Sequence, residues 1–255
     1  MLKYNNITPN KIYYRNVLIK AVKGCDGSNV WEYQEPAPTH DYSQDYLTFV
    51  PLASTTFQCS KAVSYSLDDG ATWTNLPANT ATPSVHIGDK ILWKAQLTTP
   101  GTFHSSIGRF NVEGNAMSLI YGDNFVGQTS LGRATLHDLF TNETRLISAE
   151  NLVLPATTLT ASCYSNMFQS CTALTAAPVL PAPTLVSSCY LQMFENCTSL
   201  KSITCLATDI SALYCTNNWV SGVAATGTFT KASSMTGWTT GTSGIPSGWS
   251  VQDFQ

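Results

Sequence analysis

The sequence predicts a β-rich amino-terminal module followed by a short solenoid of repeats, and three observations support this fold class. The pattern of residues 154–179 recurs from Leu180 onward, at a shift of 26 residues, and a fixed period of this size is typical of stacked arrays. In the first half, short runs of aromatic and β-branched residues recur between turn residues, which favours antiparallel strands. No stretch before Ala116 has helical periodicity.

The repeat is defined by columns of equivalent residues: Leu154 and Leu180, Cys163 and Cys189, Phe168 and Phe194, Cys171 and Cys197, Leu174 and Leu200. Upstream, residues 139–146 fit the same pattern, with Glu143 in the second cysteine column. Downstream, Leu206, Cys215 and Trp219 begin a third unit that then loses the pattern. Degenerate ends around a regular middle are typical of capping repeats, so we assign residues 116–255 to a solenoid with caps, the last being a carboxy-terminal cap.

Within each repeat we expect an α/β unit. Residues 162–171 should form a short helix or 3₁₀ turn, and the stretch after them should form a strand. Alternation along that strand places small side chains outward: Ser148 and Glu150, Ala176 and Pro178, Ser202 and Thr204. Solenoids commonly bind partners through their repeated strand face. We therefore predict a binding surface that suits a flat, neutral partner.

The amino-terminal half divides into two segments. Residues 1–45 contain a predicted β-hairpin, with its turn at Cys25, Asp26 and Gly27, and a linker at residues 35–45. Residues 46–115 contain eight strand-like runs, which predict a small antiparallel, sandwich-like domain.

Composition excludes several classes of protein. The net charge of −3 and the lack of a Lys/Arg cluster argue against a nucleic-acid partner. No apolar run approaches the roughly 20 residues that a membrane-spanning helix needs. The first residues lack an apolar segment, which predicts no secretory signal peptide.

The repeats resemble the leucine-rich repeats of BspA-like proteins, with their phenylalanine–x–x–cysteine–x–x–leucine core. Residues 168–174 and 194–200 carry that core, and the sequences LPATTL, TGTF and GIPSGW resemble a subgroup common in gut Bacteroidales. The resemblance implies a leucine-rich-repeat solenoid and a non-enzymatic adhesion protein at a cell surface or outside the cell, with a protein or glycan ligand. Residues 17–33 resemble short modules of phage structural proteins. The alternative is therefore a phage or mobile-element protein, located in the phage particle, that displays the repeats for host attachment.

Six of the eight cysteines belong to the array. Adjacent coils stack at about 4.8 Å, which permits a disulfide on Cα separation, but a column of three cannot pair completely. We expect free thiols packed as small apolar groups. A zinc site is not expected, because no C-x₂-C pair exists.

A pattern resembling the Asp-box of sialidase propellers runs from Ser66 to Trp73. It predicts a hairpin turn in which the Asp68 carboxylate accepts backbone N–H groups, Gly70 adopts a positive φ and Trp73 packs underneath. The alternative interpretation is a sugar-related element, which connects to the remote alternative of a glycan-active enzyme.

We expect no enzymatic activity, cofactor or metal. The four histidines lie in separate segments without metal-ligand spacing, and the usual nucleophile, phosphate and dinucleotide motifs are missing. The carboxylates of Glu113, Asp123, Asp138 and Glu150 have no spacing that favours a glycosidase pair.

One tyrosine per repeat, at Tyr164, Tyr190 and Tyr214, stands beside a column cysteine. We expect each ring to be buried against the next coil. An exposed row that stacks on sugars or on a protein epitope is the alternative binding face.

Overall fold

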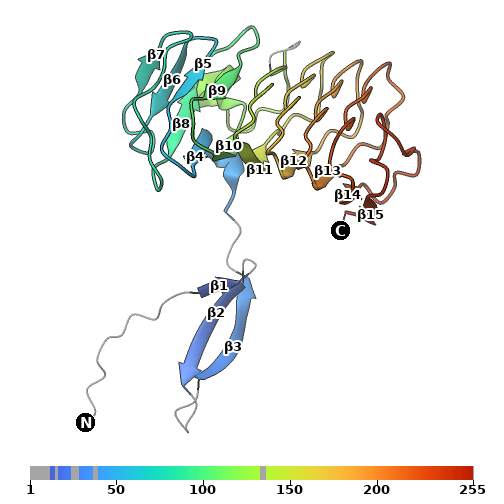
Figure 1. Cartoon of the computed structure of the whole chain (residues 1–255), viewed down its shortest axis with the longest axis horizontal. Helices are drawn as coiled ribbons and strands as arrows, with labels where there is room; N and C mark the ends of the chain where they lie inside the picture. Colours follow the sequence, from blue (N-terminus) through green and yellow to red (C-terminus); the bar gives the residue numbers. More distant parts are fainter. Residues whose placement is uncertain (1–11, 15–16, 24–28, 37–39, 133–135, 255) are drawn as a thin grey trace. The chain divides into compact units, whose positions relative to one another are not determined.

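The computed structural model describes residues 12–14, 17–23, 29–36, 40–132 and 136–254. The chain divides into two compact units, residues 1–41 and residues 42–255 (Figure 1).

The first unit is a three-stranded antiparallel sheet. Its strands are β1 (Ile12–Tyr14), β2 (Val17–Lys23) and β3 (Asn29–Pro36), in the order β1-β2-β3. The antiparallel pairing of β2 with β3 confirms the predicted hairpin. Its turn at residues 25–27 and residues 37–39 of the predicted linker lie outside the described residues.

The second unit is built on one ten-stranded sheet with the order β15-β14-β13-β12-β11-β10-β4-β8-β6-β7. The strands of its first module are β4 (Leu47–Pro51), β5 (Phe57–Cys59), β6 (Val63–Ser66), β7 (Thr74–Leu76), β8 (Ile91–Lys94), β9 (Phe103–Ser105) and β10 (Phe110–Asn115). Those of the solenoid are β11 (Leu146–Val153), β12 (Ala176–Leu180), β13 (Ser202–Cys205), β14 (Thr228–Lys231) and β15 (Ser250–Asp253). Helical turns are short: η1 (Tyr42–Gln44), α1 (Ser118–Tyr121) and η2 (Gly122–Asn124).

Aromatic residues fill the core of the first module. The pair β5–β9 forms a separate two-stranded sheet, and its Phe57 and Phe103 contact Phe49 of β4 at ring distances of 5.2 and 5.0 Å. One of the eight strand-like runs of residues 46–115, at residues 84–88, forms no strand and contributes only the bridge between Val85 and Thr55.

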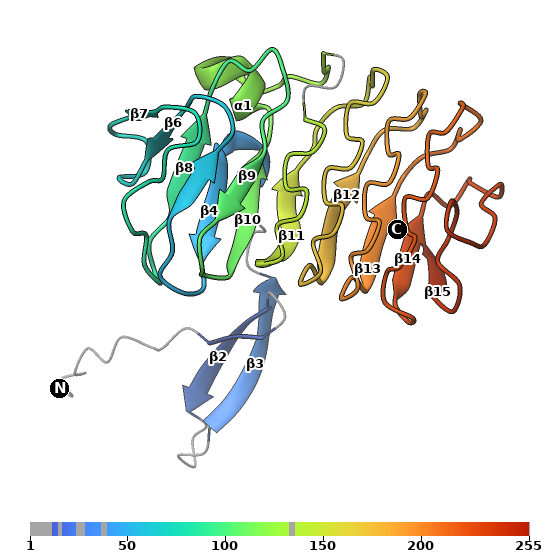
Figure 2. The ribbon, with the colours of Figure 1, turned by 45° about the horizontal axis from the view of Figure 1, so that its top comes forward.

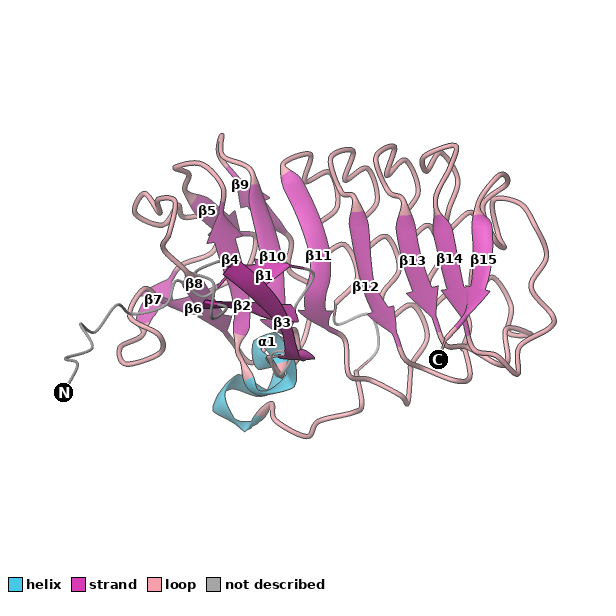
Figure 3. Ribbon diagram, turned by 90° about the horizontal axis from the view of Figure 1, so that it is seen from below, coloured by secondary structure: helices cyan, strands magenta, loops and turns pink. Residues whose placement is uncertain are grey.

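The ten-stranded sheet passes from the first module into the solenoid without a break. Strand β10 pairs antiparallel with β4 and parallel with β11, so the predicted division between residues 115 and 116 falls inside one continuous sheet (Figure 2). From β10 onward every pairing is parallel. The result is a parallel β-solenoid of about four turns. Figure 3 shows its strands β11 to β15 side by side.

The strand registers measure the length of each coil. In neighbouring strands, Ser148 pairs with Ala176, Ala176 with Ser202, Ser202 with Thr228, and Thr228 with Ser250. The successive offsets along the chain are 28, 26, 26 and 22 residues. The predicted period of 26 is therefore confirmed. The third unit also completes its coil, although its side-chain pattern fades.

The side of the solenoid opposite the strands is not helical, which corrects our expectation of a helix or 3₁₀ turn at residues 162–171. Every fourth residue there has a positive φ, near 52–61° in two consecutive coils: Ser162, Asn166 and Ser170, then Ser188, Gln192 and Asn196. An α-helix requires consecutive right-handed residues, so a left-handed residue every four positions ends it repeatedly. Asn and other short polar residues tolerate this conformation better than most residues do.

Backbone hydrogen bonds on this turn side connect one coil to the next. The Tyr164 N–H donates to the Cys189 carbonyl at 3.1 Å, and the Phe168 N–H donates to the Met193 carbonyl at 2.9 Å. Between them, the Asn166 N–H donates to the Leu191 carbonyl of the next coil at 2.9 Å, whereas the N–H groups of Ser165 and Met167 close turns within their own coil. The coils are thus joined by backbone hydrogen bonds on both the strand side and the turn side.

Aromatic rings form a continuous stack through the solenoid core. Phe140 stacks on Phe168 at 5.5 Å and Phe168 on Phe194 at 5.6 Å. Trp219, at the position of Met193 in the previous coil, contacts Phe194 at 6.1 Å and stacks on Trp238 at 5.5 Å. The larger indole therefore closes the core where the repeat pattern fades.

The second cysteine column is part of this core. The Cys171 thiol donates to the Phe140 carbonyl at 3.0 Å, and the Cys197 thiol donates to the Phe168 carbonyl at 2.9 Å. The seven described cysteines are free and buried, which agrees with our expectation of unpaired thiols for the array. Glu143 occupies the same column at the first coil and is also buried.

Candidate functional site

The outward side of the solenoid strands carries a row of small, uncharged side chains. Its members are Ser148, Ala176, Ser202, Thr228 and Ser250, each opposite the next in the parallel register. Ser202 and Ser250 are exposed, and the other three are half-buried. Parallel strands lie about 4.8 Å apart, so this row presents small side chains, four of them with a hydroxyl group, at a regular spacing.

A second outward row runs parallel to the first and corrects one predicted position. Val179, not Pro178, is paired with Thr204. The register of β12 shifts between Ala176 and Val179, so Pro178 points inward and is buried, whereas Val179 is exposed. The prediction for Pro178 assumed strict alternation, which an irregularity of this kind breaks.

Both rows continue beyond the residues that we predicted. Thr204 is paired with Thr230 and Thr230 with Gln252, at offsets of 26 and 22 residues. The Gln252 amide donates to the Thr230 hydroxyl at 2.9 Å. A 26-residue shift from Ser202 and Thr204 would have found Thr228 and Thr230 in the sequence, whereas the shorter last coil hid Ser250 and Gln252.

We define the strand face as the two rows together with Glu150, which is exposed on β11. Glu150 donates its N–H to the Ser148 hydroxyl at 3.2 Å. At the far end of the strand face, Lys231 pairs with Asp253, and Phe254 is 48% exposed. A shallow recess of about 620 Å³ lies here, lined by Thr204, Thr230, Gln252, Asp253 and Phe254.

The expected burial of the tyrosine rings is confirmed for Tyr164 and Tyr190 and wrong for Tyr214, so the alternative binding face does not form a row. Tyr164 and Tyr190 are each 1% exposed, and their ring centroids lie 6.1 Å apart inside the solenoid. Burial raises the pKa of both phenols well above the usual value. Tyr214 is 58% exposed because it precedes Cys215, whereas the other two tyrosines follow their cysteines. The alternative binding face is therefore wrong for Tyr164 and Tyr190.

The titratable side chains singled out in the sequence lie in separate places. Glu113 pairs with Lys90 at 2.6 Å, Asp123 with Lys94 at 2.7 Å, and Asp138 with His137 at 2.6 Å. Glu150 is exposed on β11. Each of the first three carboxylates thus has its own cationic or imidazole partner, in a different part of the described chain.

The Asp-box turn has the predicted structure. The Asp68 carboxylate accepts the Thr72 N–H at 2.9 Å and the Thr72 hydroxyl at 2.7 Å, and the Ser66 hydroxyl donates to it at 2.7 Å. Gly70 has a φ of 87°. Trp73 packs against Tyr46 at a ring distance of 4.8 Å. The hydrogen bonds from Thr72, followed by that from Ser66, lower the pKa of Asp68 to about 2.

Within the described ranges, no three His, Cys, Asp or Glu side chains are grouped so that they could hold a metal ion. None of the helices in these ranges is long and apolar enough to cross a membrane.

Comparisons of this chain with protein-family models, with curated proteins and with solved structures find no match.

Proposed function

We propose that this chain is a non-enzymatic binding or adhesion protein whose strand face contacts a protein or glycan partner. The observation that carries the proposal is the paired series of small uncharged residues from Ser148 to Ser250. A rigid parallel sheet holds these side chains at fixed spacing, so a flat partner meets them without ordering any loop.

The chemistry of the strand face limits the partner. Its hydroxyl groups both donate and accept hydrogen bonds. Glu150 is its charged residue, and Lys231 and Asp253, at its far end, pair with each other. A phosphate polymer would need a cluster of cations on the strand face to neutralise its charge. A neutral glycan or an uncharged protein surface fits the strand face better.

We further propose that the coils are leucine-rich repeats of the BspA-like type and that the module before them is sandwich-like. The buried Phe168, Cys171 and Leu174 and their equivalents one coil later support the first assignment. The packing of the β5–β9 pair against Phe49 supports the second. By the same resemblance, the proposed location is a cell surface or the extracellular space.

A glycan array and a pull-down from host and bacterial surface extracts test the proposal on the purified full chain. Ser202→Arg and Thr204→Arg should abolish the captured signal without lowering the melting temperature, because outward strand positions tolerate such changes. Ser187→Arg, at an exposed position on the turn side, is the matched control and should bind normally. Normal binding by both strand-face variants with loss in the control would reject the assignment.

The separate three-stranded unit of β1 to β3 favours a second candidate function. In this alternative the chain is a phage or mobile-element structural protein that displays the solenoid for host attachment. Neighbouring tail or capsid genes would support it, whereas an upstream lipoprotein signal in the same reading frame would support the cell-surface protein.

A further inference from the structure

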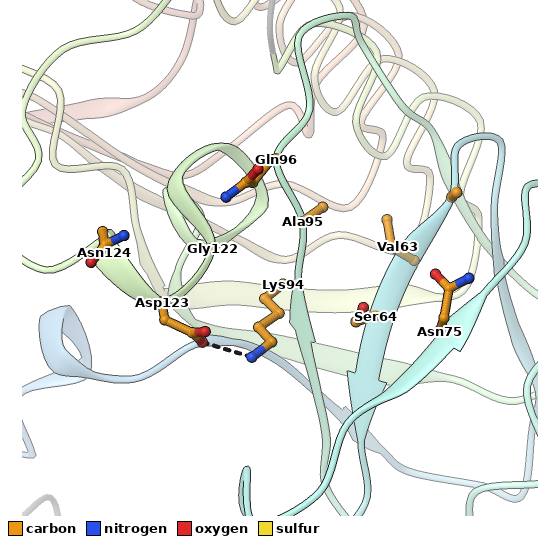
Figure 4. Close-up of a pocket in the computed structure, with 10 residues that line it drawn as sticks. Val63, Ser64, Asn75, Lys94, Ala95, Gln96, Gly122, Asp123 and Asn124 are labelled. Carbon is orange, nitrogen blue, oxygen red and sulfur yellow. Dashed lines mark hydrogen bonds and ion pairs between the residues drawn. The ribbon is translucent and has the colours of Figure 1, made fainter.

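A small polar pocket lies in the first module, apart from the strand face. Its volume is about 350 Å³, near the lower end of the roughly 300–1,000 Å³ typical of small-molecule sites. Figure 4 shows its wall of side chains from β6, β7, β8 and the η2 turn.

The floor of the pocket is one row across three strands. Ser64 of β6 is paired with Asn75 of β7 on one side and with Lys94 of β8 on the other. Residues directly opposite one another in antiparallel strands share a face of the sheet. Gln96, just after β8, and Asn124 of η2 complete the polar lining.

The charges in the pocket are held in place and balance each other. The Asp123 Oδ1 atom accepts hydrogen bonds from the Lys94 ammonium and from the Tyr46 hydroxyl, both at 2.7 Å. The Lys94 Nζ atom also lies 4.1 Å from the centre of the Trp73 ring, and the Asp-box turn directly precedes that tryptophan. A carboxylate paired with an ammonium leaves no net charge for a phosphate or a metal ion.

The remaining polar groups are uncommitted. Among the described residues, the side chains of Ser64, Asn75, Gln96 and Asn124 make no hydrogen bond within the protein, and neither does the Oδ2 atom of Asp123. An amide side chain donates and accepts at the same time, as does a hydroxyl. Adjacent hydroxyl groups of a sugar match this set, because each of them also donates and accepts.

We propose that this pocket binds a neutral saccharide unit, with Asn75, Gln96 and the free Asp123 oxygen as its hydrogen-bonding groups. An apolar ligand would leave these polar groups unpaired, which lowers its affinity. The site goes beyond the proposed function, because it lies in the first module and does not include the strand face.

Saturation-transfer NMR on the full chain, with the methyl glycosides of glucose, galactose, mannose and N-acetylglucosamine as probes, tests the proposal. At least one glycoside should bind saturably, with a dissociation constant on the order of 1 mM for about a dozen heavy atoms. Asn75→Ala and Gln96→Ala should each weaken it about five- to tenfold, the effect of losing one or two hydrogen bonds. Asn217→Ala, on the turn side of the solenoid, is the matched control and should leave the affinity unchanged.

Three outcomes would overturn the proposal. The first is that no glycoside binds at about ten times that concentration. The second is that Asn75→Ala and Gln96→Ala, with unchanged melting temperatures, bind as the wild type does. The third is that Ser202→Arg removes glycoside binding, which would place the sugar on the strand face. Retained glycoside binding by Ser202→Arg, with loss of the array signal, would support two separate sites.

Discussion

The Glu143 carboxylate accepts the backbone N–H of Ser105 at 2.7 Å, from a strand 38 positions earlier in the chain. It also accepts the Ser105 hydroxyl at 3.1 Å and the Arg145 N–H at 3.0 Å. In later coils the same column holds Cys171 and Cys197, whose thiols donate to a carbonyl of the preceding coil. The first coil borders β9 instead, so an acceptor replaces a donor at this position.

Glu143→Gln should lower the free energy of unfolding by about 1–3 kcal/mol, because its amide NH₂ would face buried donors. Urea titration monitored by tryptophan fluorescence measures the loss. Glu150→Gln, at an exposed position, is the control and should change stability by less than about 0.5 kcal/mol. Equal effects of the two substitutions would contradict the role assigned to Glu143.

The ring stack predicts a second stability effect. Phe168→Ala and Phe194→Ala should each cost about 3–5 kcal/mol, because each removes a fully buried ring from between two neighbours. Tyr214→Ala removes an aromatic ring from the same solenoid at an exposed position and should cost far less, about 0.5 kcal/mol. A loss below about 1 kcal/mol for either phenylalanine would show that the stack does not hold the coils together.

The thiols of the array should be unreactive in the folded protein. Burial raises the pKa of Cys163 and of Cys205 to about 12 and raises those of Cys171 and Cys197 as well. Since the thiolate is the reacting form, an aromatic disulfide reagent at pH 8 should label these thiols only after denaturation. A Cys25→Ser background removes the thiol that lies outside the described residues.

Mass spectrometry under non-reducing conditions gives an independent check on the thiols. The array peptides should appear with free cysteines. A Cys163–Cys189 or Cys171–Cys197 bridge would refute the prediction and would place the protein in an oxidising compartment.

The Asp-box turn predicts a pH dependence. The folded-state pKa of Asp68 is about 2, below the ordinary value of about 3.9 for an aspartate. A lowered pKa means that the contribution of this carboxylate to stability is present above about pH 4 and is lost as the pH falls toward 2. A carboxyl-carbon NMR titration should give a midpoint near pH 2 for Asp68, and a midpoint near 4 would contradict the hydrogen-bonded turn.

Asp68→Asn tests the same turn through stability. Its unfolding free energy should vary less with pH between about 4 and 2 than that of the wild type. Asp69→Asn is the comparison, because Asp69 lies in the same turn at a φ of 53°, a conformation that asparagine tolerates. Because this variant keeps Ser66, Asp68 and Thr72, the carboxyl midpoint of Asp68 should stay near pH 2 in it.

Column residues made the period and the core predictable from the sequence. Phe168, Phe194 and the cysteines beside them recur at one spacing, and all are buried as a stacked array requires. The turn conformation was not predictable in this way. The left-handed residues Asn166 and Gln192 are polar and differ between coils, so apolar periodicity contains no trace of them.

The strand face was predictable only where alternation holds. Ser202 and Thr204 lie outward as expected, whereas the shift within β12 exchanges Pro178 for Val179. The polar pocket brings together strands and a turn that are far apart in the chain, from Ser64 to Asn124. Such a juxtaposition depends on the sheet order, which local sequence patterns do not determine.

From Phe140 to Trp219 the coils of this solenoid are joined by the same pattern of backbone hydrogen bonds on the turn side, and parallel strand pairs join them on the other side. Removing residues 180–205 would delete β13 and bring the remaining part of β12 against β14, with the donors and acceptors still facing each other. The gene segment for one coil is therefore a unit that recombination between neighbouring repeats can delete or duplicate without breaking the fold. Related genes should accordingly differ in length by multiples of one coil. The length of the solenoid can then change over generations while the side chains of each coil stay the same.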